Sequence, residues 1–177
     1  MSGQGTPRWP LGLPTRLRPV RPIGSGSSAV VWLVRDTEVG RDVAVKVLSG
    51  IDASGARTSR LEQEARALAR LADVPGICTL HEVGCTDDGT GWAVVDLAVG
   101  GTMADRAPLD EREVARVGAV VARTLATIHA HEVCHGDLTP SNVLFDDTGS
   151  PLLADFAMSA LGGPGDPGGG LTPAWGA

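Results

Sequence analysis

The stretch His135-Gly136-Asp137-Leu138-Thr139-Pro140-Ser141-Asn142 decides how this sequence is interpreted. It places an asparagine five residues after an aspartate, and it follows a long segment of helical periodicity. A carboxylate in a loop can accept or orient a hydroxyl proton, and an amide oxygen can bind Mg²⁺. The ordinary alternative is a polar turn that contains proline. The residue types and their spacing favour a catalytic role for Asp137 and a metal-binding role for Asn142.

The only lysine of the chain is Lys46, at the end of the strand-like run Val43-Ala44-Val45-Lys46. Lysine and arginine are not interchangeable where a compact ammonium group has to bind phosphate as a point charge. Lys46 is therefore a candidate for binding the α- and β-phosphates of a nucleotide. It needs a carboxylate partner, and Glu64 in the next helical segment is the candidate. The ordinary alternative for Glu64 is a solvent-exposed helix charge.

A glycine-rich segment, Gly24-Ser25-Gly26-Ser27-Ser28, stands between two strand-like runs. Glycines allow the backbone to approach a polyphosphate and to present N–H groups to it. No Gly-Lys-Ser or Gly-Lys-Thr sequence follows, and a strand rather than a helix comes next, so neither a Walker A loop nor a Rossmann turn fits. An ordinary glycine hairpin remains the alternative for this segment taken alone.

The segment Ala154-Asp155-Phe156-Ala157 follows a short strand-like piece. It offers a carboxylate for Mg²⁺ and an aromatic side chain that can pack beneath it. Taken alone, it could equally be an Asp-Phe pair that ends a strand by chance. Its position after the other three segments gives it weight.

In this order and at this spacing, the four segments resemble the protein kinase superfamily. The resemblance extends from about Leu17 to the last residue. It implies an α+β, protein-kinase-like two-lobed fold, with a complete β-rich N-lobe that carries one regulatory helix and an incomplete helical C-lobe. It also implies a bacterial serine/threonine protein kinase of the eukaryotic-like type that uses ATP and Mg²⁺.

The resemblance assigns roles to matching positions. Asp137 would be the catalytic base, and Lys46 with Glu64 would be the nucleotide lysine and its helix partner. Asn142 and Asp155 would bind Mg²⁺. The ATP-binding set would comprise Gly24, Gly26, Val31, Ala44, Lys46, Asp96, Ala98 and Leu144.

Within that set, Val31 and Ala44 would pack on adenine and Leu144 would lie beneath it. The backbone of residues 96–98 would form the hinge that bonds adenine, with Val95 as the gatekeeper. A hydrophobic stack that links the lobes in active kinases would consist of Leu68, Leu80, His135 and Phe156.

Ala29 stands where the family usually has a third glycine, and three further departures from the family pattern matter more. Gly136 replaces the usual arginine. A phosphorylated activation loop therefore has no arginine to bind at this position, and regulation by that route is not expected. Thr139 replaces the catalytic-loop lysine, and the loss of a cation there should slow phosphoryl transfer. Ala157 replaces the glycine of the Asp-Phe-Gly triplet, which restricts flipping of this loop.

Hydrophobic periodicity and turn residues predict the elements. Strands are expected over 17–48, 77–83, 92–97, 142–145 and 152–154, and helices over 59–72 and 111–131. Residues 1–15 are expected to be a disordered Gly/Pro-rich tail, 16–98 the N-lobe, and 99–177 a partial C-lobe that contains the hinge, the long helix, the catalytic loop and the start of the activation segment.

Composition narrows the class of partner. The formal net charge is −6, which argues against a nucleic-acid or anionic-membrane surface. No apolar run reaches the ~20 residues of a membrane span, and the three cysteines show no metal-ligand spacing and fit a reducing compartment. A cytoplasmic protein is therefore expected, and its protein substrate is not identified by the sequence.

Three functions stay open at this point. The first is a serine/threonine protein kinase that transfers the γ-phosphate of ATP to a protein hydroxyl. The second is a pseudokinase, a nucleotide-binding module without efficient transfer, and the third is a small-molecule phosphotransferase of the aminoglycoside or choline type, which shares the His-Gly-Asp sequence. The chain is interpreted as truncated at the alanine of the Ala-Pro-Glu segment, as a truncated gene product, a sequence fragment or a degenerate paralogue. Another chain or a missing segment is therefore expected to cover exposed C-lobe surface.

Overall fold

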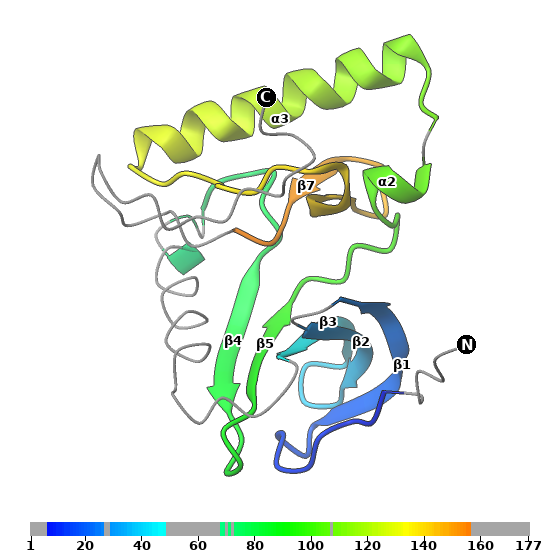
Figure 1. The fold of residues 1–177 in the computed structure, drawn as a ribbon, viewed down its shortest axis with the longest axis vertical. Coiled ribbons are helices and arrows are strands. Elements are labelled where there is room, and N and C mark those ends of the chain that lie inside the picture. Colours follow the sequence, from blue (N-terminus) through cyan, green and yellow to red (C-terminus); the bar gives the residue numbers. More distant parts are fainter. Residues whose placement is uncertain are drawn as a thin grey trace. The chain divides into compact units, whose positions relative to one another are not determined.

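A computed structural model describes residues 7–26, 29–48, 68–69, 71, 73–106 and 108–156 (Figure 1). The chain divides into two compact units, residues 1–62 with 80–97 and residues 63–79 with 98–177, here termed the first and the second unit. The boundary after Leu97 falls inside the expected hinge. Residues 63–79 were expected in the N-lobe, but they group with the second unit because Leu71 and Ile77 are buried in its core.

The first unit is built on a five-stranded antiparallel sheet with the order β1-β2-β3-β5-β4. Its strands are β1 (Leu17–Ser25), β2 (Ala29–Asp36), β3 (Arg41–Leu48), β4 (Leu80–Cys85) and β5 (Gly91–Val95). The expected strands are therefore present. The strand predicted from Ile77 begins only at Leu80, because Ile77 forms an isolated parallel bridge to Leu153 in the second unit instead.

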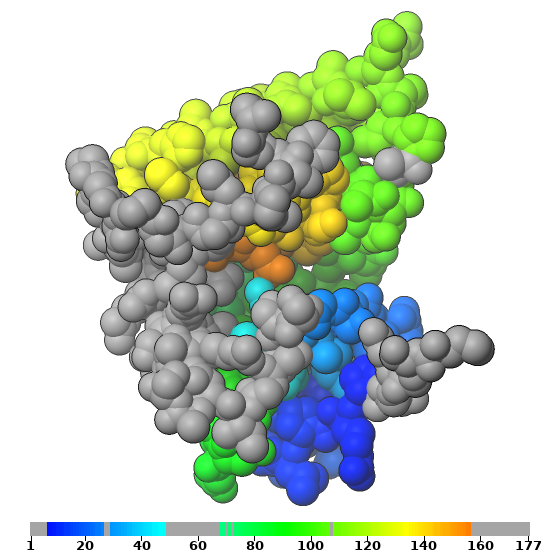
Figure 2. All heavy atoms as spheres, viewed as in Figure 1, coloured from blue at the N-terminus to red at the C-terminus, as the bar shows by residue number. Residues whose placement is uncertain are grey.

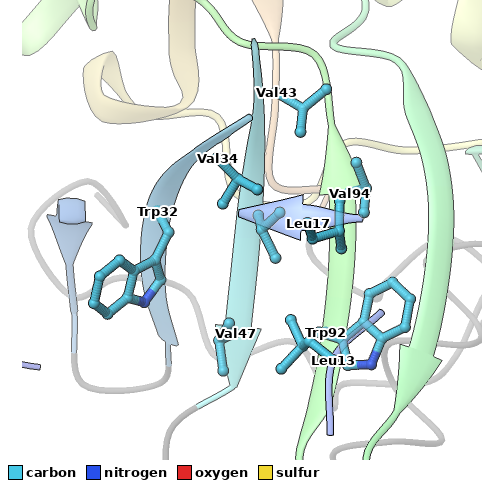
Figure 3. Close-up of a cluster of buried hydrophobic side chains, with 9 residues drawn as sticks. Leu13, Leu17, Trp32, Val34, Val43, Val47, Trp92 and Val94 are labelled. Atoms are coloured by element: carbon cyan, nitrogen blue, oxygen red, sulfur yellow. The ribbon is translucent and has the colours of Figure 1, made fainter. Parts of the chain in front are cut away.

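Alternation along the strands explains the core of the first unit. Val43, Val45 and Val47 of β3 point to the same side of the sheet, since successive side chains of a strand face opposite ways. Figure 3 shows Val43 and Val47 with their labelled neighbours from β1, β2 and β5. The buried cluster comprises Leu13, Leu17, Trp32, Val34, Val43, Val45, Val47, Trp92 and Val94.

The segment before β1 is ordered against this sheet from residue 7 onward. Leu13 is buried in the core cluster, and the ring of Trp9 meets that of Trp32 edge to face, with 5.4 Å between their centroids. The Arg16 guanidinium pairs with buried Asp36 and with Glu82. This differs from the expected disordered tail over 1–15, because the segment brings its own large apolar side chains to the sheet. Residues 1–6 lie outside the described residues.

In the described part of the second unit, residues 98–156 form helical segments and a small hairpin. Its elements are α2 (Met103–Arg106), α3 (Glu111–Ala130), η1 (Pro140–Asn142), β6 (Val143–Phe145) and β7 (Pro151–Leu153). Their apolar side chains form a second buried cluster, which includes Phe145 and Ile128, neither of which is exposed at all. The short hairpin was expected, whereas α2 was not.

Helix α3 confirms the predicted long helix almost residue for residue. The Asp110 carboxylate caps it by accepting the backbone N–H of Glu113 at 2.8 Å. Val117 and Ile128 of this helix are buried, while Val114 near its start is 48% exposed. Figure 2 shows the outer side chains of α3 as a continuous ridge coloured green to yellow.

Two further expectations concern helices. Most of the helix predicted over residues 59–72, the regulatory helix, lies outside the described residues, where only Leu68, Ala69 and Leu71 are described. None of the helices in the described ranges has the length and apolar character needed to cross a membrane. Short helix α2 has a sequence signal in Thr102 and Asp105, which form reciprocal bonds of the capping-box type.

Candidate active site

Lys46 lies on the sheet face opposite the core cluster of the first unit. Antiparallel register places it directly across from Val31 of β2 and from Ala93 of β5. Ala44, two residues earlier on the same face, lies across from Val95. The structure therefore places Val31, Ala44 and Lys46, which the sequence predicted for nucleotide binding, on one face together with the predicted gatekeeper Val95. Alternation in β3 produces this arrangement, since the valines between them face the core.

The predicted glycine loop lies between β1 and β2 at one end of this face. Gly24 pairs with Val31, and a Cβ at Gly24 would stand 3.8 Å from the Val31 Cβ, which is ordinary contact distance. Gly26 donates its backbone N–H to the Ala29 carbonyl at 2.9 Å. Ser27 and Ser28 lie outside the described residues, so the described part of the loop is its two glycine-bearing ends.

A hydrogen-bond network in the second unit holds the stretch from His135 to Asn142. The Asn142 side-chain amide donates to the Asp137 carbonyl at 2.8 Å and to the Asp137 carboxylate at 3.3 Å. The Asn142 backbone N–H in turn donates to the Thr139 carbonyl at 3.0 Å, within the turn η1. The aspartate and the asparagine five residues apart are therefore in direct contact.

The same network reaches the residue before Asp155. Ala154 donates its N–H to the Asn142 carbonyl at 2.9 Å, and its own carbonyl accepts a bond from the His135 ring at 3.0 Å. Both backbone groups of Ala154 are thus bonded to the loop. These bonds hold the backbone segments that carry Asn142 and Asp155, the two predicted metal ligands, next to each other. The short hairpin of β6 and β7 provides this approach.

His135 is the buried centre of the loop, with 3% of its surface exposed. Its Nε2 donates to the Ala154 carbonyl, since a carbonyl can only accept, and its Nδ1 accepts the Asp137 backbone N–H at 3.4 Å. The ring is therefore neutral with its proton on Nε2.

Burial lowers the pKa of His135 below its ordinary range, because a buried imidazolium loses hydration. The bond to the Ala154 carbonyl and the charges of Asp137 and Asp155 act in the raising direction but do not outweigh burial. On its other side the His135 ring packs against Phe156, with 4.6 Å between centroids. Two members of the predicted hydrophobic stack are therefore in contact.

Two backbone conformations in the loop are unusual. Asp155 has a φ of 54°, in the left-handed region that non-glycine residues rarely adopt. Such a conformation costs about 1 kcal/mol or more and is characteristic of functional sites. Gly136 has a φ of 78°, which glycine adopts without this cost. The glycine that replaces the family arginine is thus the residue that this backbone accommodates best.

The predicted floor residue Leu144 lies on β6, where it pairs with Leu152 and bridges to Thr102. Its neighbours Val143 and Phe145 face the core instead. The chain after the predicted hinge residue Ala98 joins this strand, because Gly100 donates its N–H to the Phe145 carbonyl at 2.9 Å.

Sequence reasoning missed the residue that fixes this junction. The Arg106 guanidinium lies 3.8 Å above the Phe145 ring, and its Nε donates to the Gly100 carbonyl at 3.0 Å. A Cβ at Gly100 would come within 2.7 Å of the Arg106 guanidinium and of the Phe145 Cβ. An arginine on a four-residue helix carries no sequence signal for such a role.

Two sequence-predicted residues cannot be placed. Glu64, the predicted partner of Lys46, and Ala157, which follows Phe156, both lie outside the described residues. Among the residues that are described, no three His, Cys, Asp or Glu side chains gather in a way that could hold a metal ion. The predicted ligand pair of one amide and one carboxylate is smaller than such a cluster.

Comparison with known proteins identifies the class. The chain matches the protein kinase domain family over residues 17–167. It is 37% identical over 145 residues to the DNA damage-responsive serine/threonine-protein kinase RqkA of Deinococcus radiodurans. The aligned region covers 78% of this chain and 21% of that protein. The chain is 33% identical over 148 residues to the serine/threonine-protein kinase PknK of Mycobacterium tuberculosis, which covers 81% of this chain and 13% of that protein.

A plant relative shows the same similarity. The chain is 34% identical over 149 residues to CBL-interacting protein kinase 4 of Oryza sativa subsp. japonica, which covers 80% of this chain and 32% of that protein. The chain thus spans about a third or less of the length of these relatives. This chain belongs to the protein kinase domain family. The predicted family and α+β kinase fold class are confirmed.

Proposed function

We propose that this chain is the catalytic domain, or part of it, of a serine/threonine protein kinase that transfers the γ-phosphate of ATP to a protein hydroxyl. Membership of the protein kinase domain family and relatives named as serine/threonine kinases support the proposal. The single observation that carries it is the hydrogen-bonded loop from His135 to Asn142, which fixes a carboxylate and an amide side by side.

In this proposal Asp137 orients the substrate hydroxyl. The hydroxyl oxygen forms a bond to the γ-phosphorus while the bond from that phosphorus to the β–γ bridging oxygen breaks. ADP leaves with the electron pair of the broken bond, and the hydroxyl proton passes to the Asp137 carboxylate. The bond from Asn142 keeps this carboxylate in place for the transfer.

The nucleotide would be bound by residues on the Lys46 face of the sheet. The Lys46 ammonium would offset phosphate charge, with Glu64 as its partner, and the backbone of Gly24 and Gly26 would approach the phosphates. Val31 and Ala44 would pack on adenine. Asp96 and Ala98 would contribute hinge backbone groups, and Leu144 would contribute an apolar floor.

The donor set fits a magnesium ion. The Asn142 amide nitrogen is bonded to Asp137, which leaves the amide oxygen as the atom for a metal, and Asp155 supplies a carboxylate. When bound, Mg²⁺ supplies positive charge that offsets the phosphate charge during transfer. The bonds to both backbone groups of Ala154 would hold the segment that carries Asp155 beside the loop that carries Asn142.

Thr139 is expected to make phosphoryl transfer slow. A catalytic-loop lysine stands at this position in many protein kinases, as the resemblance implies, and threonine carries no charge to offset that of the moving phosphate. Binding of ATP without efficient transfer is accordingly the second candidate function. A phosphotransfer assay and a binding assay separate the two.

The test uses the chain of 177 residues with radiolabelled Mg-ATP and casein as the acceptor. Label is expected on serine or threonine, and Asp137→Asn should reduce the rate by about 100-fold or more. Asp147→Asn, at an exposed aspartate of the same unit, is the matched control and should keep the wild-type rate. Thermal stabilisation by Mg-ATP without any transfer would support the pseudokinase, and neither binding nor transfer would overturn both.

Two further parts of the proposal concern surroundings. A cytoplasmic location is proposed because it supplies ATP and would keep the three cysteines reduced. The protein substrate and a partner that covers exposed C-lobe surface also remain proposals.

A further inference from the structure

Asp96, the first residue of the proposed hinge, is held by side chains from both neighbouring strands. Strand β5 ends at Val95, and the sheet order places β3 on one side of β5 and β4 on the other (Figure 1). His81 of β4 brings its Nε2 to 2.6 Å from the Asp96 carboxylate. Arg41, the first residue of β3, brings its guanidinium to 3.8 Å from the same oxygen. The segment that follows β5 is therefore bound through the Asp96 side chain to both neighbouring strands.

A bulge in β4 places the histidine. The register between β4 and β5 shifts between Leu80 and Glu82, so His81 is the extra residue of the bulge. A bulge re-aims a side chain relative to regular pairing, and bulges are over-represented beside active sites. His81 is thereby directed at the residue after the end of β5. The arrangement is built into the backbone and does not depend on a flexible side chain alone.

The hydrogen-bond chemistry fixes which contacts are attractive. A carboxylate oxygen can only accept, so His81 Nε2 must carry a proton and donate it to Asp96. That leaves no lone pair on Nε2 for the Arg41 guanidinium, which lies 3.0 Å away. Arg41 is therefore held by its charge attraction to Asp96. The Asp96 side chain is 35% exposed and that of His81 26%, so water screens the group only in part.

We infer that His81 and Arg41 are positioning residues for adenine nucleotide binding, which act by fixing the Asp96 backbone. This inference rests on the proposed function, in which hinge backbone groups bond adenine. A side chain anchored in advance restricts the torsions of its own backbone, so less conformational freedom is lost when the nucleotide binds. Releasing Asp96 should weaken nucleotide affinity without a comparable loss of folding.

The experiment measures the Kd for Mg-ATP by calorimetry and the Tm without nucleotide, on the full 177-residue chain. His81→Leu and Arg41→Gln should each raise the Kd about three- to fivefold, the scale of a partly exposed charged interaction. His81→Gln retains an N–H donor and should restore affinity toward wild type. Arg35→Gln is the matched control, because Arg35 pairs with Asp42 in the same sheet at 3.1 Å and is as exposed as Arg41.

The outcomes separate this inference from the proposed function. A wild-type chain that binds Mg-ATP, with Kd raised by His81→Leu and not by Arg35→Gln, supports the inference. Unchanged Kd in the His81 and Arg41 variants, an equal effect of Arg35→Gln, or no rescue by His81→Gln overturns it and leaves the proposed function standing. A wild-type chain with no affinity for Mg-ATP overturns both.

Discussion

At the scale of single residues, His135 connects the loop of residues 135–142 to the segment that carries Asp155. Its two ring nitrogens are both bonded, one to the Ala154 carbonyl and the other to the Asp137 backbone. A protonated ring could keep the first bond and would lose the second, because Nδ1 would then carry hydrogen. The geometry of the loop therefore depends on a neutral imidazole.

This dependence predicts an effect of pH on stability. The pKa of His135 is lowered in the folded state by burial, so the unfolded chain binds a proton that the folded chain does not. The contribution of the neutral His135 ring to the free energy of unfolding is fully present above about pH 6.5, the ordinary pKa of histidine. It is lost as the pH falls below this value. The free energy of unfolding should decrease by up to about 1.4 kcal/mol per pH unit from this group.

The measurement is chemical denaturation of the chain at several values between pH 7.5 and pH 5.5. His135→Asn has no ring to protonate and should show a smaller decrease over this interval than wild type. Equal pH slopes in the two proteins would show that His135 does not contribute in this way.

At the scale of elements, the start of helix α3 depends on a single cap. The Asp110 carboxylate accepts the Glu113 N–H, one of the N–H groups without a partner in the first turn. Its negative charge also lies near the positive end of the helix dipole. The cap and Val117, which is buried seven residues later, together set where the helix begins and which face it buries.

Replacing this cap should destabilise the second unit. Asp110→Ala removes the acceptor and should lower the free energy of unfolding by about 1 kcal/mol. Asp110→Ser retains a capping oxygen and is the control, with an expected change of less than about half that amount. Urea denaturation followed by circular dichroism measures both. An alanine variant as stable as the serine variant would contradict the assignment of the cap.

At the scale of the whole molecule, the described residues form a buried cluster in each unit. The first cluster includes Leu13, which precedes the sheet in sequence and is 9% exposed. Trp9 and Arg16 on either side add a ring contact and an ion pair to buried Asp36. The segment before β1 is thus part of the fold of the first unit.

The two leucines of this segment provide a matched test. Leu13→Ala removes a buried side chain and should cost about 2 kcal/mol or more, whereas Leu11 is 89% exposed and Leu11→Ala should change stability by less than about 0.5 kcal/mol. Amide hydrogen exchange should show the loss of protection in strands β1 to β3. Equal effects of the two substitutions would show that the segment does not pack on the sheet in solution.

The sequence by itself determined the family, most strand positions and helix α3, because these depend on local patterns. Alternation of valines fixed which face of β3 carries Lys46, and helical spacing with an aspartate cap fixed α3. The pairing of Asp137 with Asn142 was also predictable, since both residues belong to one loop.

Tertiary structure alone decided the remaining features, because they join residues far apart in the chain. Residues 1–15 were expected to be disordered, yet Trp9 and Leu13 pack against strands that come later in the sequence. The contacts of Asp96 with His81 and Arg41 require a bulge in β4 and an arginine of β3, and no local sequence pattern predicts either. The chemistry proposed for the stretch from His135 to Asn142 follows from its residue types and their spacing. Its bond to Ala154 and its ring contact with Phe156 depend instead on the tertiary structure, which brings a later segment of the chain against it.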